Sequence, residues 1–327
     1  MSSVAPPSLD ADDPRPKGFA SQGLSLNYVD WGHAGAPLLI LVHGGFDHSR
    51  SFDDLARALR PDFHVLAVDL RGHGDSDWSA EGNYTLNAQA EDLAELLRHL
   101  PVSRATLIGH SYGGRVVLRF AGLYPERVDR LIVLEGLDPN RRKAKAARSL
   151  DVATRHRNYR ASLRDLRGRA ERGFASLSEA ADRMRARNAR LKPELALHLA
   201  RHGTRQGEDG RLRWKFDRCV GPVAPVDITP RDERWLFSRI SAPTLLIHGD
   251  ESGLARPDQD DRVALMPSVE TIEISGAGHW MHHDRPSETR AAIVDFLLRA
   301  VSTGASGSRP EPLSDIQTEE SALCAKP

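Results

Sequence analysis

Short runs of consecutive apolar residues recur along the chain and predict buried strands. The clearest is LLILV at 38–42, in which every position is apolar, as expected of a strand that is covered on both faces. The same pattern recurs further along the chain, at 64–69, 105–108, 131–134, 244–247 and 270–274. These runs predict a sheet with both faces buried.

Segments with a helical spacing of apolar residues lie between these runs. Residues 88–100 place four leucines on one stripe, and Pro101 ends that helix. Residues 115–124 and 288–299 show a similar spacing. The alternation of strands and helices predicts an α/β fold with a mostly parallel central sheet flanked by helices.

The alternation is interrupted between residues 139 and 239, where no buried strand is predicted. Amphipathic helices are expected there instead, including 177–191 and 194–202. A connection of about a hundred residues is too long for a loop. We therefore expect 139–239 to form an inserted helical cap.

The remaining chain consists of two segments that carry the sheet, one on each side of the cap, and of two ends that carry no strand. Residues 18–138 and 240–301 are expected to form the core. The N-terminal 1–17 is rich in Pro, Asp and Ser, and the tail 302–327 contains few apolar residues. Both ends are expected to be disordered, because they cannot bury enough apolar surface to offset the loss of chain entropy.

The charge is balanced overall but unevenly distributed. The chain has 45 Lys and Arg against 45 Asp and Glu, whereas residues 141–220 hold 23 basic and 9 acidic residues. The basic stretch is interpreted mainly as solvated helix faces, with attraction of anionic substrates as the alternative. Aromatic residues are sparse within it, and no nucleic-acid-binding motif is found, so nucleic acid is not an expected partner.

The chain carries no pattern typical of export or of membrane insertion. Cys219 and Cys324 cannot form a disulfide framework. The N-terminus lacks the apolar stretch of a signal peptide, and no run approaches the ~20 apolar residues of a membrane span. We expect a soluble cytoplasmic protein without a membrane partner, and the sequence does not predict its oligomeric state.

One motif predicts a nucleophile. The sequence Gly109-His110-Ser111-Tyr112-Gly113 has the form G-x-S-x-G and lies between a predicted strand and a predicted helix. A sharp turn would raise the Ser111 hydroxyl above the sheet edge, and side chains at the two glycine positions would collide there. The helix that follows would stabilise negative charge at its N-terminus.

With this motif the chain resembles the α/β-hydrolase fold superfamily over about residues 20–300. LVHGG at 41–45 is similar to the family's oxyanion loop, and VDLRGHGDS at 68–76 is similar to a loop that braces it. The resemblance implies an oxyanion hole formed by the backbone N–H groups of Tyr112 and Gly45, with Phe46 as the alternative to Gly45. His43 and His73 in these loops are interpreted as structural.

The general base is expected in the loop that follows the last strand. His279 lies in the sequence ISGAGHWMHHDRP, directly after the strand at 270–274, where the fold places this residue. His282 and His283 are the competing candidates, but they are expected to begin the next helix and to lie at its surface. His279 would take a proton from Ser111 and return it to the leaving group.

The acid that orients the base has several candidates, because the usual positions after the strand at 244–247 are occupied by Ser252 and Gly253. Glu135, at the end of the preceding strand, is favoured, and some members of the superfamily are known to place the acid there. Asp250 is the main alternative. Glu251 and Asp138 remain further candidates.

A serine nucleophile restricts the chemistry. Haloalkane dehalogenases and epoxide hydrolases of this fold require an aspartate nucleophile, whereas serine suits acyl transfer. GDESGL at 249–254 resembles the serine hydrolase-like branch of the superfamily. Residues 44–56, at the oxyanion loop, and 183–204, in the cap, support the same resemblance. The expected function is an esterase-like hydrolase that acts on a small molecule, without metal or cofactor.

Two alternative functions are a carbon–carbon bond hydrolase of the same fold and a non-enzymatic small-molecule binding protein.

Aromatic residues of the second half of the chain could form apolar walls of the site or could serve only in packing; they are Trp214, Phe216, Trp235 and Trp280.

Overall fold

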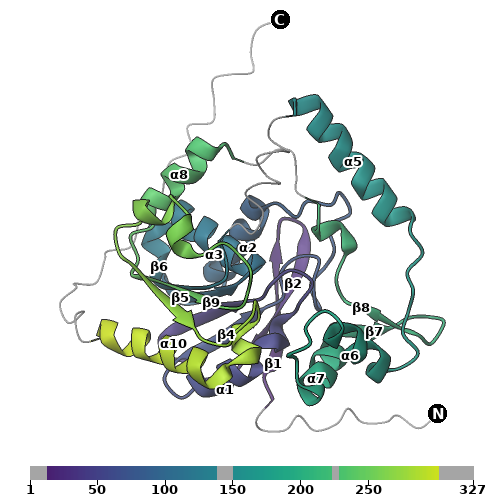
Figure 1. Cartoon of the computed structure of the whole chain (residues 1–327), viewed down its shortest axis with the longest axis horizontal. Coiled ribbons are helices and arrows are strands. Elements are labelled where there is room, and N and C mark those ends of the chain that lie inside the picture. The colour runs from purple at the N-terminus through teal and green to yellow at the C-terminus, as the bar shows by residue number, and fades with distance from the viewer. Residues whose placement is uncertain (1–12, 138–149, 223–227, 302–327) are drawn as a thin grey trace, which may run out of the picture.

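A single eight-stranded sheet forms the centre of the molecule (Figure 1). The structure is a computed structural model that describes residues 13–137, 150–222 and 228–301. The strand order in the sheet is β1-β2-β4-β3-β5-β6-β9-β10. The bounds are β1 (Arg15–Ser21), β2 (Leu24–Asp30), β3 (Leu38–Val42), β4 (His64–Val68), β5 (Ala105–His110), β6 (Val128–Leu134), β9 (Thr244–Gly249) and β10 (Val269–Ile274).

The sheet is mostly parallel, as predicted. Every pair of neighbours from β4 to β10 runs in parallel, whereas β2 is antiparallel to both β1 and β4. The carboxyl ends of the central strands β5, β6 and β9 therefore meet at one edge of the sheet. In open α/β sheets that edge is where ligands bind.

Helices cover both faces of the sheet (Figure 1). Leu39 and Leu41 of β3 pack toward α1 and α10, whereas Ile40 and Val42 pack toward α2 and α3. This alternation of successive side chains explains the continuous apolar runs, because both faces of each central strand are buried. The helix bounds are α1 (Asp53–Leu59), α2 (Leu86–Arg98), α3 (Tyr112–Leu123), α9 (Met281–Asp284) and α10 (Pro286–Val301).

The N-terminal strands were not predicted from the sequence. β1 is exposed at its first four positions, so it lacks a continuous apolar run. It begins at Arg15, three residues before the predicted start of the core at 18. Such an edge strand gains its stability from backbone pairing with β2 rather than from burial of both faces.

The inserted region is mainly helical, and it also contains a short hairpin that was not predicted. Strands β7 (Thr204–Gln206) and β8 (Leu212–Trp214) pair antiparallel. Helix α8 packs on α3, where a Cβ at Gly122 would approach the Leu236 Cβ to 2.8 Å. By its contacts α8 therefore joins the helical layer of the core, although the predicted boundary at 239 places it in the cap. The helices are α5 (Val152–Gly168), α6 (Leu177–Arg185), α7 (Pro193–Gly203) and α8 (Pro230–Arg239).

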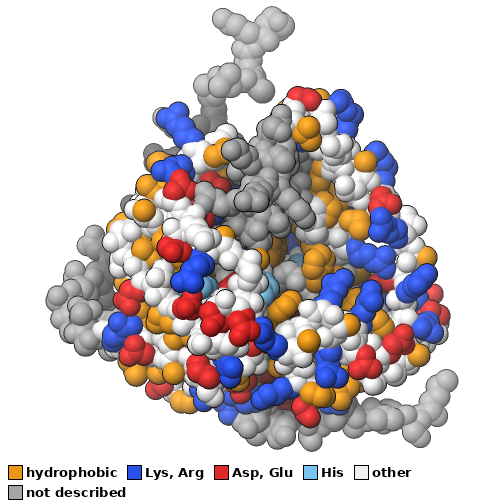
Figure 2. All heavy atoms as spheres, viewed as in Figure 1, with side chains coloured by type: hydrophobic (Ala, Val, Ile, Leu, Met, Phe, Trp, Pro, Cys, Tyr) orange, Lys and Arg blue, Asp and Glu red, His pale blue; other side chains and the backbone are white. Residues whose placement is uncertain are grey.

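The surface of the inserted region is rich in basic side chains. Figure 2 shows Lys and Arg side chains along α5 and over α6 and α7, and a hollow with hydrophobic side chains between α5 and the core. Across the described ranges, none of the helices combines the length and apolar character needed to cross a membrane.

Candidate active site

Ser111 lies at a sharp turn between β5 and α3, at the centre of the sheet edge. Its backbone has φ 51° and ψ −112°, a conformation that is strained for a residue with a side chain. The Ser111 N–H donates to Leu134 O at 2.8 Å, which fixes the turn against β6. A Cβ at Gly109 would lie 2.6 Å from Gly113 O, which explains why this turn excludes larger residues.

The side chain of His279 connects Ser111 to Glu135. His279 Nε2 lies 2.9 Å from Ser111 Oγ, and Nδ1 lies 3.1 Å from Glu135 Oε2. Because a carboxylate can only accept, the Nδ1 atom carries the ring proton of a neutral imidazole. The Nε2 lone pair is then available to accept the hydroxyl proton of Ser111.

Glu135 is buried and both of its carboxylate oxygens are hydrogen-bonded. Its side chain is 1% exposed. Oε1 accepts from the Gly249 N–H at 2.9 Å, and Oε2 binds the His279 ring. The residue directly follows β6 and has φ 51°, a second strained position at this edge of the sheet. A buried carboxylate needs such partners, because the loss of hydration is otherwise uncompensated.

The other candidate acids bind elsewhere. Asp250 accepts from the Gly276 N–H at 2.7 Å and from the Ser275 hydroxyl at 3.2 Å, in an exposed position. Glu251 is also exposed and pairs with Arg190 of the inserted region. Asp138 lies outside the described residues. Of the carboxylates described, Glu135 is therefore the one that the structure brings to the His279 ring.

The prediction that His282 and His283 lie at a helix surface is wrong, because their exposed fractions are 7% and 8%. They lie on the short helix α9, which packs against the segment before α1. The His282 ring stacks on Phe52 at a centroid distance of 5.1 Å, and His283 Nε2 lies 3.1 Å from Ser51 O. This burial arises from contacts with residues more than two hundred positions earlier.

The predicted oxyanion loop lies beside the nucleophile turn. A Cβ at Gly45 would be 3.6 Å from the Tyr112 Cβ, so the two backbones approach each other closely. Gly45 is exposed, and Tyr112 is the first residue of α3. Phe46 has φ 63° and is 43% exposed, an unusual combination for a large apolar residue.

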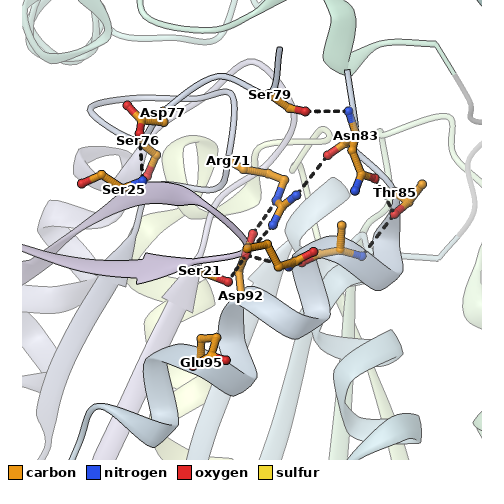
Figure 3. Close-up of polar contacts among 12 residues, drawn as sticks. Ser21, Ser25, Arg71, Ser76, Asp77, Ser79, Asn83, Thr85, Asp92 and Glu95 are labelled. Carbon is orange, nitrogen blue, oxygen red and sulfur yellow. Dashed lines mark hydrogen bonds and ion pairs between the residues drawn. The ribbon is translucent and has the colours of Figure 1, made fainter. Parts of the chain in front are cut away.

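The loop at 68–76 braces the oxyanion loop, as predicted. His43 Nε2 accepts from the Leu70 N–H at 3.1 Å, and its Nδ1–H donates to Gly44 O at 2.7 Å. The brace is anchored in turn by Arg71, whose guanidinium makes two 2.6 Å contacts with Asp92 on α2 (Figure 3). Such a bidentate pair fixes both the position and the orientation of the loop.

Burial lowers the pKa of several structural histidines, which makes the stability pH-dependent. The pKa values of His43, His48 and His73 fall from 6.5 to about 3 because burial opposes the charged ring. Between about pH 3 and 6.5 these three rings therefore bind more protons in the unfolded chain than in the folded one. We predict a lower free energy of unfolding at pH 5.0 than at pH 7.5, measured by urea denaturation. An equal or higher value at pH 5.0 would contradict this assignment of neutral rings.

Within the part of the chain that the structure describes, no group of three or more His, Cys, Asp or Glu side chains could hold a metal ion.

The aromatic residues that could line the site differ in position. Trp280 packs against the His279 ring at a centroid distance of 5.0 Å, whereas Trp235 is 57% exposed on α8. Phe216 packs on Phe46 at 5.0 Å and on Trp214 at 5.8 Å, so these rings link the oxyanion loop to the insertion.

Two residues at the site were not identified from the sequence. Gly249 donates to Glu135, and a Cβ there would lie 2.3 Å from Ala277 O. The ring of His110 lies 4.9 Å from that of His279, between centroids. The sequence feature that could have identified His110 is a histidine at the end of a buried strand, directly before the nucleophile.

Comparisons with known proteins agree with this fold. A family model described as alpha/beta hydrolase fold matches residues 37–286. The chain is 28% identical over 286 residues to the sn-1-specific diacylglycerol lipase ABHD11 of Mus musculus, covering 84% of this chain and 85% of that protein. It is 28% identical over 280 residues to Esterase YbfF of Escherichia coli strain K12, covering 81% of this chain and 94% of that protein.

Solved structures show the same fold at lower identity. The thioesterase domain from the curacin biosynthetic pathway matches with a TM-score of 0.71 and 22% identity, covering 86% of this chain and 99% of that one. Taken with the family match over most of its length, this places the chain in the α/β-hydrolase fold family, as a protein similar to esterases and lipases.

Proposed function

We propose that the protein is a serine hydrolase that cleaves the carboxylic ester, or a related acyl bond, of a small molecule. Ser111 is the nucleophile, His279 the general base and Glu135 the acid that orients it. The observation that carries the proposal is the continuous hydrogen-bonded series from Ser111 Oγ through the His279 ring to Glu135, with contacts of 2.9 and 3.1 Å.

Acylation begins at the Ser111 hydroxyl. Its oxygen attacks the ester carbonyl carbon while the proton passes to His279 Nε2. The carbonyl electrons move to oxygen, and the N–H groups of Gly45 and Tyr112 stabilise this oxyanion, with Phe46 as the alternative donor to Gly45. When the tetrahedral intermediate collapses, the carbon–oxygen bond to the alcohol breaks and His279 returns its proton to that alcohol.

Deacylation repeats these steps with water. His279 takes a proton from the water, whose oxygen attacks the acyl carbon, and the Ser111 ester bond then breaks as His279 returns this proton to Ser111 Oγ. The imidazolium formed in each half-reaction needs a nearby negative charge. Glu135 supplies this charge from a buried position, where water screens it little.

The aromatic side chains next to the oxyanion loop support a substrate with a bulky apolar group. Phe46 is exposed beside the turn that carries Ser111, and Phe216 of the insertion packs edge-on against it. A substrate group placed between core and insertion would cover these rings. Aromatic contacts of this kind contribute about 0.5–1.5 kcal/mol beyond the area that they bury.

Phe216→Ala is therefore expected to reduce kcat/KM for aromatic esters by about tenfold, since 1.4 kcal/mol corresponds to a factor of ten. Acetate esters of small alcohols should change by less than about threefold, because they do not reach the ring. Steady-state kinetics on both ester types measures the difference.

Trp235→Ala is the matched control for this prediction. Trp235 is also a large aromatic residue, but it lies on α8, where Arg239 covers its ring at 4.8 Å from the centroid. Its replacement should leave the ratio of the two kcat/KM values unchanged. An equal loss on both ester types in Phe216→Ala would argue that this residue serves only in packing.

Hydrolysis of p-nitrophenyl esters of varied acyl length and charge by the full chain tests the function itself. Saturable turnover that is abolished in Ser111→Ala supports the proposal. A purified, folded protein that leaves the whole panel uncleaved, or a Ser111→Ala variant that retains turnover, would overturn it. A binding protein would leave the whole ester panel uncleaved.

A further inference from the structure

His110 joins the nucleophile turn to the loop that carries His279. Its Nε2 atom lies 2.8 Å from the backbone carbonyl oxygen of His279. A carbonyl oxygen can only accept, so Nε2 must carry the ring proton. His110 is the last residue of β5 and Ser111 follows it directly. Adjacent residues of the turn therefore bind the same histidine, one at its main chain and one at its ring.

The position of the His110 ring is restricted on several sides. The residue is 1% exposed, and its ring lies 4.9 Å from the His279 ring and 4.5 Å from the His282 ring, between centroids. On the oxyanion side, a Cβ at Gly44 would lie 2.9 Å from His110 Nδ1. The ring thus contacts the base loop, helix α9 and the oxyanion loop, and has little room to rotate.

Burial also keeps this ring neutral. The pKa of His110 lies well below its usual range, mainly because of burial and secondly because of the neighbouring His279. Within the described chain, Nδ1 is buried without a hydrogen-bond partner, so protonation there would gain no partner for the new N–H. The Nε2–H tautomer, and with it the contact to His279, is therefore maintained at neutral pH.

We propose that His110 is a positioning residue, which holds the main chain of His279 so that its ring faces Ser111 at hydrogen-bonding distance. This inference rests on the proposed function. His279 lies in a loop with glycines at 276 and 278, whose N–H groups donate to Asp250 and Asp284, whereas His110 binds the main chain of His279 itself. A shift of about 1 Å in a reacting group can lower the rate about a hundredfold.

A purely space-filling role is the competing explanation. An apolar side chain of similar size would fill the same volume without a buried, unpartnered nitrogen, which costs about 1–3 kcal/mol. The two explanations differ in what they require at the end of the side chain. Positioning requires a hydrogen-bond donor aimed at the His279 carbonyl, whereas filling requires only bulk.

The variants His110→Met and His110→Gln separate these explanations, because the two side chains are similar in length and only glutamine retains a donor. For His110→Met we expect kcat to fall about 10- to 100-fold, while KM changes less than about twofold. For His110→Gln we expect kcat within about threefold of the unmodified protein.

His248→Met is the matched control. His248 is also a buried histidine near the end of a strand; Nε2 is bound to Glu273 at 3.0 Å, and Nδ1 has no hydrogen-bond partner among the described residues. It should keep normal kcat and KM. If His110→Met does not fold, His110→Asn removes the same contact, because its amide is too short to reach the carbonyl. It should then show the loss of kcat instead.

Each outcome is decisive. Normal kcat in His110→Met overturns the inference, and so does an equal loss in the methionine and glutamine variants, because the donor would then be irrelevant. A rise in KM without loss of kcat would likewise contradict it. If the unmodified protein neither hydrolyses esters nor reacts with a fluorophosphonate, the proposed function itself fails, and the positioning role fails with it.

Discussion

Replacing Glu135 with glutamine is expected to lower kcat by about 10³- to 10⁴-fold while the protein stays folded. Glutamine has nearly the same shape but no charge, so it cannot stabilise the imidazolium that forms when His279 takes the Ser111 proton. If its amide NH₂ faces Nδ1, it also favours the wrong ring tautomer. Steady-state kinetics, with the urea midpoint as a check on folding, measures this effect.

Asp250→Asn is the matched control, because it makes the same chemical change in the alternative acid. Asp250 binds Ser275 and the Gly276 N–H at an exposed position. Its replacement should change kcat by no more than about threefold. The reverse ranking of the two variants would move the acid to the loop after β9 and contradict the assignment of Glu135.

Gly113→Ala is expected to destabilise the fold by about 3 kcal/mol, or to prevent soluble expression. In an ordinary helix a change from glycine to alanine would raise the free energy of unfolding by up to about 1 kcal/mol. Here, however, the new Cβ would lie 2.3 Å from Val42 O and 2.4 Å from His43 O. Both obstacles are backbone atoms of β3 and the oxyanion loop, which cannot move aside as a flexible side chain could.

Gly168→Ala is the control for this second prediction. Gly168 is also a helical glycine, at the end of α5, but a Cβ there would have no atom of the described chain within 4 Å other than those of its own helix turn. Its free energy of unfolding should stay constant or rise by up to about 1 kcal/mol. If Gly113→Ala is as stable as Gly168→Ala in urea denaturation, the close packing of α3 against the oxyanion loop would be refuted.

The fold was predictable where burial leaves a clear pattern in the sequence. The central strands, such as β3, are covered on both faces and appear as continuous apolar runs. The edge strand β1 is exposed at most of its positions, and the β7–β8 hairpin is short and half-buried, so neither produces such a run. These strands are held by backbone pairing with a neighbouring strand and by the turn between them, and neither leaves a pattern of apolar residues in the sequence.

The candidate site was predictable where a tight backbone requires particular residues. Gly109 and Gly113 leave a recognisable spacing because any larger residue would collide. The choice between Glu135 and Asp250 depends on where two loops at adjacent strand ends point, which local sequence does not determine. The burial of His282 depends on contact with Phe52, far away in the chain.

The central claim is that Ser111 is an activated nucleophile, and the most direct measurement is active-site labelling of the full chain with a fluorophosphonate, followed by mass spectrometry of its peptides. The account predicts a single phosphonylated residue, Ser111, with labelling absent in Ser111→Ala and strongly slowed in Glu135→Gln. A folded protein that stays unlabelled at Ser111, or that is labelled only at another residue, would contradict it.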